Sequence, residues 1–362
     1  MPTTSSGDVS FRVLKVAQVV GNPSGGVMSC VMNYFRNVDR QKVQFDFYTY
    51  HPSPYDDEIR SLGGNVFHFP NVFNPKSAKV LEEQFKQNGY DVVHAHLTTR
   101  SGFALKAAKR AGVAVRICHA HSTAHFSEGL AFLAKTLLKP HAKKYATHFA
   151  GCSKRSAEWL FGTTDGVFLM KNALDLTRFC YRPKPFSEVK TVGFVGRFVF
   201  QKNLFFLLDV FKRLSELRND VKLVLVGDGK DKQKLQKKAK KICGDKIVFA
   251  EERSDVENCY ATFDLFLLPS RFEGMPLVAV EAQACGAPCL ISDVVSEEAD
   301  VGNAQFLPLG DVELWAQAAC RALDRNRVEI DGERLRSLGY DVKKQAPELL
   351  RYYQSITSKQ IV

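Results

Sequence analysis

The chain has 362 residues, of which 45% are hydrophobic and 25% are charged, and its formal net charge is +11 at pH 7. This length is too great for one typical core and sufficient for two domains, and the composition is ordinary for a soluble globular enzyme. No apolar run approaches the ~20 residues of a membrane-spanning helix, so the sequence argues against an integral membrane protein.

The first residues, MPTTSSGDVSF, contain no basic region followed by an apolar stretch, so we expect no secretory signal. Nine cysteines are scattered between Cys30 and Cys320, and no pair has CxxC spacing. An odd number of cysteines without metal-ligand spacing favours reduced thiols over disulfides or structural zinc. The sequence therefore predicts a cytoplasmic protein.

Strand-like and helix-like segments alternate through the first half of the chain. An apolar run at 11–20 is followed by the glycine-rich GNPSGG at 21–26 and an amphipathic segment at 27–38. Helical patterns at 77–89 and 100–112 each end at a glycine, as helices often do. We expect further short strands at 44–50, 65–69, 91–96, 114–121 and 147–153.

The same alternation restarts after a stretch that is rich in proline and charge and has no clear period. We place the linker at 173–190, between a first domain at 1–172 and a second at 191–340, and we expect a C-terminal helix at 341–362 that packs back on the first domain. Alternating strands and helices predict an α/β fold of two doubly wound, Rossmann-like domains that face a central cleft, where ligands bind. In the second half we expect strands at 191–198, 221–227, 246–250, 265–269 and 288–292, and helices at 204–217, 230–242 and 276–286.

The stretch PSRFEGMPLVAVEAQACGAPCLISD (269–293) contains two acids in unusual surroundings. Glu273 lies in a loop after a predicted strand, and Glu281 lies in a short helix made otherwise of small apolar residues. A loop acid and an exposed helix acid are the simpler interpretation. The apolar neighbours of Glu281 instead favour a buried acid, and buried acids are usually paired or functional.

The short helix can present its N-terminus to an anion. Pro276 suits the first helical position, Gly286 suits the position past the last turn, and the N–H groups of Leu277 and Val278 then point out of the helix. With a rise of about 1.5 Å per residue, the two carboxylates lie about 10 Å apart, farther than the ~5.5 Å of a retaining glycosidase pair. This layout fits an extended ligand with hydroxyls at both ends and phosphates between them, such as a nucleotide sugar.

Two further segments could bind phosphate. In VGFVGRFVFQKNL, Arg197 and Lys202 follow a strand and could hold a diphosphate and offset its charge, although surface charges are the simpler interpretation. Gly25 and Gly26 would let the backbone approach a phosphate, although a plain turn fits equally well. Neither this glycine pair nor VGDGKD matches GxGxxG, which argues against a dinucleotide cofactor.

Two strands end in pairs of histidines, in DVVHAHL and RICHAHST. Strand alternation places His94 and His96 on one face, and His119 and His121 on one face. Four histidines could form a metal site, but no cysteine or acidic ligand accompanies them, so we expect no metal. A polar contact to substrate at the edge of the cleft is the favoured interpretation.

Positive charge is concentrated between Arg100 and Arg155, where eleven lysines and arginines accompany one acid, Glu128. Such a region suits an anionic partner. Apolar residues at 130–138 interleave with lysines, so this segment could lie on an anionic membrane surface, and a helix packed into the first domain with a solvated basic face fits equally well. The charge alone could indicate nucleic acid, but no helix-turn-helix, zinc or RNA-binding motif supports that partner, so we expect none.

Together these motifs resemble those of the family 4 retaining glycosyltransferases of the GT-B fold, in the bacterial exopolysaccharide and capsule branch. The resemblance covers nearly the whole chain, and its most specific motifs are E-x7-E, here Glu273 and Glu281, and G-R-x4-K, here 196–202. It implies transfer of a hexosyl or N-acetylhexosaminyl group from a nucleotide-sugar donor, most commonly UDP-linked, to a glycan or lipid-linked acceptor. The other anchors are GNPSGGV, DVVHAH, RICHAHS, LMKNALDLTRF and LVLVGDG.

The resemblance also implies a role for each site residue. Glu273 would contact the donor sugar, Glu281 would hold the ribose hydroxyls, and His121 would lie near the reacting carbon. Arg197 and Lys202 would bind the diphosphate and stabilise the leaving group. Further donor contacts would come from Gly25, Gly26, Gly274, Met275, Pro276 and Leu277, and contacts to the acceptor or sugar from His96, His119 and Asn172.

The family mechanism implies no metal or other cofactor, and retention by same-face attack in which the leaving phosphate helps to deprotonate the acceptor. Two segments depart from the family pattern. The linker motif N-G-[VI]-D is here Asn172-Ala173-Leu174-Asp175, and 250–253 lacks a glycine that is common there. A sugar-nucleotide epimerase or hydrolase on the same frame is the alternative function. An acceptor on a lipid would place the protein at the inner face of the cell membrane.

Overall fold

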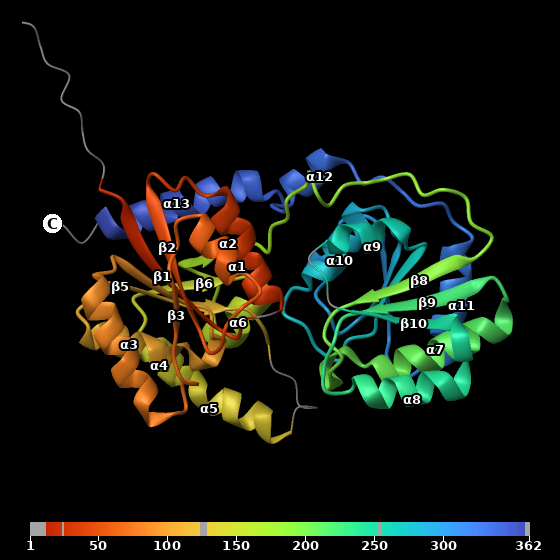
Figure 1. Cartoon of the computed structure of the whole chain (residues 1–362), viewed down its shortest axis with the longest axis horizontal. Coiled ribbons are helices and arrows are strands. Elements are labelled where there is room, and N and C mark those ends of the chain that lie inside the picture. Colours follow the sequence, from red (N-terminus) through yellow and green to blue (C-terminus); the bar gives the residue numbers. More distant parts are fainter. Residues whose placement is uncertain (1–11, 24, 124–128, 252, 254, 359–362) are drawn as a thin grey trace, which may run out of the picture.

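The computed structural model describes residues 12–23, 25–123, 129–251, 253 and 255–358. Within these residues the chain forms two parallel β-sheets, one in each half, and the halves lie side by side with helices around each sheet (Figure 1). This arrangement confirms the predicted α/β class with two doubly wound, Rossmann-like halves.

Among the described residues, the first sheet has seven strands in the order β3-β2-β1-β4-β5-β6-β7, and every neighbouring pair is parallel. The chain order changes direction between β1 and β4. In open sheets of this kind, ligands bind beyond the carboxyl ends of the strands at such a switch point. The strands are β1 (Leu14–Gly21), β2 (Val43–Thr49), β3 (Val66–His68), β4 (Val92–Ala95), β5 (Val115–Ala120), β6 (His148–Gly151) and β7 (Val167–Leu169).

The second sheet is also parallel, and its described strands follow the order β10-β9-β8-β11-β12-β13. Its switch point lies between β8 and β11. Each half of the molecule therefore has one switch point of its own. The strands are β8 (Lys190–Val195), β9 (Val221–Val226), β10 (Ile247–Ala250), β11 (Leu265–Leu268), β12 (Cys289–Ser292) and β13 (Ala304–Leu307).

Helices α1, α3, α4 and α7 follow the predicted amphipathic patterns and bury their apolar faces. Helix α3 ends as predicted at Gly89, whose φ of +61° is a conformation that favours glycine. In α4 the C-cap is Ala111, and the predicted Gly112 follows it with a φ of +80°. The helices of the first half are α1 (Gly26–Asn37), α2 (Asp56–Ser61), α3 (Pro75–Asn88), α4 (Ser101–Arg110), α5 (Leu130–Lys144) and α6 (Lys154–Phe161). Those that follow are α7 (Leu204–Leu217), α8 (Lys232–Ile242), α9 (Val256–Thr262), α10 (Leu277–Ala284), α11 (Val312–Leu323), α12 (Gly332–Ser337) and α13 (Val342–Ser358).

Helix α13 crosses from the second half to the first and lies along the first sheet (Figure 1). Its Tyr353 is fully buried and bonds to groups on β1 and β4, and its Tyr352 stacks on Phe168 of β7 at 4.1 Å between ring centroids. At the crossing, the backbone of Leu174 accepts a hydrogen bond from Val342 at 2.9 Å. The two chain segments that join the halves are thus bonded to each other.

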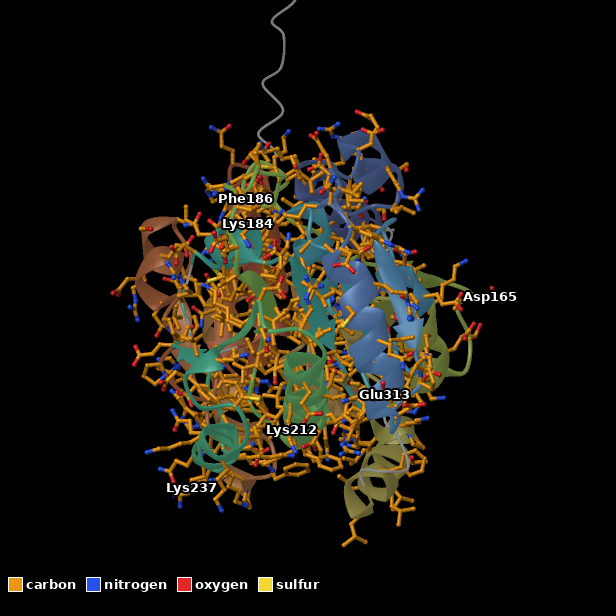
Figure 2. The ribbon with its side chains drawn as sticks, turned by 90° about the vertical axis from the view of Figure 1, so that its right-hand side faces the viewer. Asp165, Lys184, Phe186, Lys212, Lys237 and Glu313 are labelled. Carbon is orange, nitrogen blue, oxygen red and sulfur yellow. The ribbon has the colours of Figure 1, made fainter. Side chains whose placement is uncertain are left out.

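The charged face of the second half is solvated. Helix α8 turns Lys234, Lys237 and Lys240 outward while Leu235 and Ala239 are buried. Figure 2 views this side of the molecule and shows Lys237 at its periphery, with Lys212 and Glu313 also on the surface. The lysine-rich segment is therefore a solvated helix face.

Candidate active site

The predicted site residues follow the strands at the two switch points. In the first half, Gly25 follows β1, His96 follows β4 and His121 follows β5. In the second half, Arg197 follows β8 and Glu273 follows β11. Because the carboxyl ends of parallel neighbours meet at one edge, each half gathers its residues at a single edge.

Direct contacts bring these two edges together. A Cβ added at Gly274 would lie 2.2 Å from the carbonyl oxygen of His121, so the loop after β11 fits against the end of β5 only with glycine here. The Thr123 hydroxyl donates to the carbonyl of Glu273 at 3.3 Å, and Asn172 Nδ2 donates to the carbonyl of Met275 at 2.8 Å. The loop that carries Glu273 is therefore held against the first half.

Glu273 forms a buried ion pair with Lys202. Lys202 Nζ lies 2.6 Å from Glu273 Oε1, and their side chains are 11% and 8% exposed. Gln201 Nε2 donates to Glu273 Oε2 at 3.1 Å and to the carbonyl of Phe272 at 3.0 Å. The short 3₁₀ turn Phe200–Lys202 thus fixes the Glu273 carboxylate and places an ammonium group beside it.

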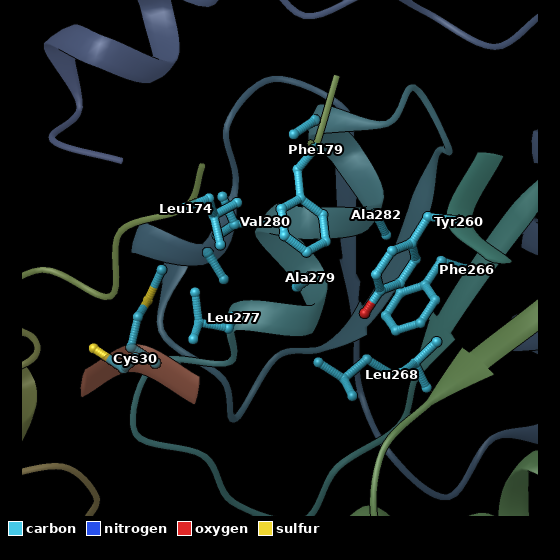
Figure 3. Packing of buried hydrophobic residues seen from close by; sticks show 14 of the residues in the cluster. Cys30, Leu174, Phe179, Tyr260, Phe266, Leu268, Leu277, Ala279, Val280 and Ala282 are labelled. Atoms are coloured by element: carbon cyan, nitrogen blue, oxygen red, sulfur yellow. The ribbon is translucent and has the colours of Figure 1, made fainter. Parts of the chain in front are cut away.

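Glu281 is buried in α10 and accepts a hydrogen bond from the hydroxyl of Tyr260 at 2.7 Å. Figure 3 shows the Tyr260 ring beside Ala282 and Phe266, among the apolar side chains around α10. Burial raises the pKa of Glu281 to about 7, and the Tyr260 hydrogen bond and the charge of Arg178 lower it in part. The predicted burial of this acid is confirmed, and its partner is a tyrosine that the sequence pattern did not indicate.

The pKa of Glu281 has a consequence for stability. Because its pKa in the folded chain lies above the usual 4.5, the stability that the protonated carboxyl contributes is present below pH 4.5 and is lost as the pH rises through about 7. A rise from 4.5 to about 7 corresponds to about 3 kcal/mol. We expect Glu281→Gln to raise the thermal midpoint relative to wild type at pH 8 and much less at pH 5. If the thermal midpoints of wild type and Glu281→Gln changed with pH in the same way, this result would contradict a raised pKa of Glu281.

The N-terminus of α10 lies next to the two acids. Pro276 was expected at the first helical position, but it is the N-cap, with φ −75° and ψ 103°, and the helix begins at Leu277. The reason is that the extended ψ of Pro276 lets the loop turn into the helix one residue later. Gly286 follows the C-cap Cys285 with φ +93°, as predicted for a residue past the last turn. The free N–H groups of the first turn therefore begin at Leu277.

A second helix N-terminus lies across from this loop. Gly25 is the N-cap of α1, with φ +88°, and a Cβ added there would lie 3.8 Å from Nε of Arg197 in the other half. Gly26 begins the helix, and a Cβ there would meet no atom within 4 Å. Arg197 is exposed. A guanidinium group and the positive end of a helix dipole thus lie together, as an anionic group requires.

The four histidines form one stacked cluster at the ends of β4 and β5. His96 Nδ1 lies 2.7 Å from His121 Nε2, and His94 Nε2 lies 3.0 Å from His119 Nδ1. His94, His96 and His119 are buried, whereas His121 is partly exposed. The structure thus brings the predicted histidines together, and the contacts of His96 and His119 to an acceptor stay predictions.

Three of these rings could approach one metal ion. His94, His96 and His119 each offer a nitrogen, and these atoms lie within 4.8 Å of one another. Five of their six ring nitrogens, however, already have hydrogen-bond partners in the protein. This pattern favours a hydrogen-bonded cluster, and the predicted absence of a metal stays a prediction.

A hollow of about 370 Å³ opens between the halves beside Phe272, the residue that precedes Glu273. Arg155 and Trp159 of α6 contribute to one wall and Arg271 and Phe272 to the other, and Arg155 donates to the carbonyl of Val294 at 3.0 Å across the gap. None of these is among the predicted site residues. The full lining is Thr123, Arg155, Glu158, Trp159, Arg271, Phe272 and Val294.

Helix α5 lies at the rim of this hollow and packs loosely. Leu130, Leu133 and Leu137 are 85%, 56% and 79% exposed, and they share one helix face. Lys139 Nζ lies 4.1 Å from the ring centroid of Trp159. Among the described residues of α5 only Ala142 is buried. The helix nevertheless contacts α4 closely, because a Cβ added at Gly102 would lie 2.3 Å from the carbonyl oxygen of His141, so the alternative of a helix packed on the first half stays open. None of the helices in the described part of the chain combines the length and the apolarity that a membrane crossing requires.

Two family models match the chain, one in each half. The model described as "Glycosyl transferase 4-like domain" matches residues 25–161, and the model described as "Glycosyl transferases group 1" matches residues 189–325. The first match includes Gly25 and the four clustered histidines. The second includes Arg197, Glu273 and Glu281.

Relatives and solved structures agree with these matches. A protein of Bacillus subtilis (strain 168) named glycosyltransferase EpsF is 35% identical over 380 residues, which cover 96% of this chain and 97% of that protein. An Escherichia coli UDP-Gal:alpha-D-GlcNAc-diphosphoundecaprenol alpha-1,3-galactosyltransferase is 26% identical over 304 residues, covering 77% of this chain and 79% of that protein. The crystal structure of HepE from Anabaena in complex with UDP superposes with a TM-score of 0.75 at 16% identity, covering 95% of this chain and all of that one.

Proposed function

This chain belongs to the family 4 glycosyltransferases of the GT-B fold, and from that premise we propose that it is a retaining hexosyl- or N-acetylhexosaminyltransferase of cell-surface polysaccharide synthesis. Its donor is a UDP-linked sugar, and its acceptor is a glycan or a lipid-linked sugar. The E. coli relative is named for a UDP-linked donor and a diphosphoundecaprenol acceptor, which supports both choices.

One observation carries the proposal. Two buried acids flank the first turn of α10, and each has its own partner: Lys202 for Glu273 and Tyr260 for Glu281. A nucleotide sugar has the matching order of groups, with sugar hydroxyls, a diphosphate and ribose hydroxyls. We assign the sugar to the Glu273 end and the ribose to the Glu281 end.

The positive groups for the diphosphate come from the chain itself. Arg197 lies beside the N-terminus of α1, Lys202 lies beside Glu273, and the first turn of α10 follows the loop that carries Glu273. Cations and helix N-termini can offset the charge that develops on a leaving phosphate. We therefore propose that transfer needs no metal ion.

This placement supports the following reaction. The acceptor hydroxyl attacks the anomeric carbon on the face that the diphosphate leaves, so a new carbon–oxygen bond forms as the old one breaks and the configuration is retained. The acceptor proton passes to the departing phosphate, and UDP is released. Arg197 and Lys202 stabilise the charge on that phosphate, and His121 lies at the edge of the first half nearest the loop of Glu273.

The hollow beside Phe272 is our candidate for the acceptor. Its wall combines an indole ring, Trp159, with two guanidinium groups, Arg155 and Arg271. An aromatic face suits the apolar side of a sugar, and guanidinium groups bind phosphates with two parallel hydrogen bonds. These groups fit a sugar that is linked through a diphosphate to a lipid.

The exposed face of α5 would bring the enzyme to an anionic membrane. We expect the protein to bind phosphatidylglycerol vesicles at low salt and to release them at about 0.5 M salt, because the attraction is screened. Reversal of Lys143 and Lys144 to glutamate should weaken binding by roughly 30-fold or more, at about 1 kcal/mol per basic residue. Vesicle co-sedimentation measures this.

The matched control reverses two exposed lysines, Lys343 and Lys344. They belong to α13, a helix that lies on the opposite side of the molecule from α5 (Figure 1). This change should leave vesicle binding close to that of wild type. Equal loss of binding in both double variants would show a general effect of net charge, and unchanged binding after the α5 reversal would refute a role for that helix.

A thermal-shift screen of nucleotides and nucleotide sugars tests the donor. A ligand at 100 times its Kd adds about 2.7 kcal/mol of apparent stability, so UDP and one UDP-sugar should raise the unfolding midpoint clearly. GDP and ADP should raise it much less. A larger shift with a purine nucleotide would refute the uridine assignment.

A further inference from the structure

A continuous line of hydrogen bonds runs from His121 at the site to helix α13 and back to His119. His121 Nε2 lies 2.7 Å from His96 Nδ1, and His96 Nε2 lies 2.8 Å from Oε1 of Gln18 on β1. Gln18 Nε2 donates to the hydroxyl of Tyr353 at 3.2 Å. This single amide therefore joins a site histidine to the C-terminal helix.

The second arm starts at the same tyrosine. The Tyr353 hydroxyl lies 2.8 Å from His94 Nδ1, and His94 Nε2 lies 3.0 Å from His119 Nδ1. His119 Nε2 ends the line as a buried nitrogen without a partner among the described residues. Gln18, Tyr353 and three of the four rings are buried, so water does not compete for these bonds.

The chemistry of an amide fixes where each proton lies. Gln18 Oε1 can only accept, so His96 Nε2 carries a proton and donates to it. A neutral imidazole has one N–H, which leaves His96 Nδ1 as an acceptor, and His121 Nε2 must donate to it. The Nδ1 of His121 is then unprotonated and can accept a hydrogen bond.

The same reasoning fixes the other arm. Gln18 Nε2 donates to the Tyr353 oxygen, and the buried hydroxyl proton needs an acceptor of its own, which His94 Nδ1 provides. His94 then donates through Nε2 to His119, and the His119 proton lies on its unpartnered Nε2. If the Gln18 amide turned over, every donor in both arms would become an acceptor. One amide therefore sets the tautomers of all four rings.

These proton positions require each imidazole ring to be neutral, and burial disfavours the charged form of the rings. Desolvation lowers the pKa of His94 and of His121 to about 3 and lowers the pKa of His96 and His119 well below its usual value. Each ring therefore carries one proton at neutral pH, and each has only two tautomers to choose between.

We propose that Gln18, anchored by Tyr353, is a positioning residue that holds His121 as the Nε2–H tautomer, with an unprotonated Nδ1 available to accept a hydrogen bond from a substrate hydroxyl. The role of His121 in transfer rests on the proposed function, whereas its tautomer does not. The anchor comes from the last helix of the chain, which packs on the first sheet after crossing from the second half.

The direct test is NMR of the full-length protein with ¹⁵N-labelled histidine at pH 7. The His121 signals are those that are missing from the spectrum of the His121→Gln variant. In wild type they should show a protonated Nε2 and an unprotonated Nδ1. Gln18→Met keeps a similar side-chain length and removes both bonds, so His121 should then show a mixture of tautomers. A wild-type His121 with its proton on Nδ1, or with both nitrogens protonated, would overturn the proposal.

Two variants guard against loss of folding as an explanation. Tyr353→Phe removes only the hydroxyl that anchors Gln18, and it should also give mixed tautomers at His121. Gln44→Met on β2 changes a partly buried glutamine outside the line, and it should leave the His121 signals as in wild type. An unchanged tautomer in both Gln18→Met and Tyr353→Phe would refute the anchoring role.

Enzyme kinetics test whether the tautomer of His121 affects sugar transfer. Gln18→Met should lower kcat by about 10-fold or more, because a histidine in the wrong tautomer cannot serve its partner, while the Kd for UDP stays within about 2-fold. Conversion of the tautomer without any change in kcat would refute the positioning role. If wild type transfers no sugar at all, the proposed function fails, and the NMR result still decides the tautomer. Zinc-shifted nitrogen signals would overturn the hydrogen-bonded arrangement in favour of a metal site.

Discussion

Replacement of Glu273 by glutamine is expected to reduce sugar transfer by roughly 100-fold or more, the effect typical of a lost electrostatic contact in an active site, while UDP binds nearly as in wild type. The carboxylate is assigned to the donor sugar, and it also fixes Lys202 at 2.6 Å. Glutamine keeps an oxygen for Lys202 and removes the negative charge. Transfer assays and calorimetric titration with UDP measure the two effects separately.

Alanine is the poorer choice at this position. It would remove the hydrogen-bond acceptor of buried Lys202 as well as its counter-charge, and truncating one partner of a buried ion pair costs about 3–5 kcal/mol, so a loss of activity could reflect unfolding. The matched control is Glu216→Gln, at an exposed acid paired with Arg213 on α7, and it should transfer sugar at the wild-type rate. Near-wild-type transfer in Glu273→Gln would refute the assignment of Glu273 to the donor sugar.

Replacement of Glu281 by alanine is expected to weaken UDP binding by roughly 10- to 100-fold, because hydrogen bonds to a charged group contribute about 1.5–3 kcal/mol. Ribose hydroxyls donate best to the ionised carboxylate. Since burial raises the pKa of Glu281 to about 7, UDP affinity of wild type should rise between pH 6 and pH 8, and the variant should lose this rise. Titration with UDP at the two pH values measures both.

Tyr260→Phe gives a graded control for this assignment. The hydroxyl of Tyr260 donates to Glu281 at 2.7 Å and lowers its pKa, so its removal should move the pH dependence of UDP binding upward. If Glu281→Ala bound UDP as tightly as wild type at pH 8, Glu281 would not contact the ribose.

Much of the fold follows from local pattern. The strands and helices that were predicted in the second half match the observed ranges closely, because apolar runs of four to six residues alternate with strongly amphipathic segments such as 204–217. Helices α9 and α11 were not predicted. The short strands β7 and β13 were not predicted. Both are only three or four residues long and mostly half-buried, and Gln305 interrupts the apolar residues of β13.

The acids and cations of the site could be predicted because they interrupt such patterns. Glu281 stands out in an apolar helix, and Arg197 and Lys202 follow a buried strand. Their partners could not be predicted, since Gln201, Tyr260 and Gln18 are ordinary residues whose importance depends on packing between distant elements. The same holds for Arg155 and Arg271, which meet at one hollow from opposite halves. The approximate separation of the two carboxylates stays a prediction.

The most direct measurement is transfer of a radiolabelled sugar by the purified protein, with a panel of UDP-sugars and a diphosphate-linked lipid acceptor. We predict that one UDP-sugar delivers its label to the lipid fraction with release of one UDP per sugar, and that the new linkage keeps the anomeric configuration of the donor. Conversion of a UDP-sugar to an epimer or to free sugar without acceptor, with no label in the lipid or glycan, would contradict a glycosyltransferase.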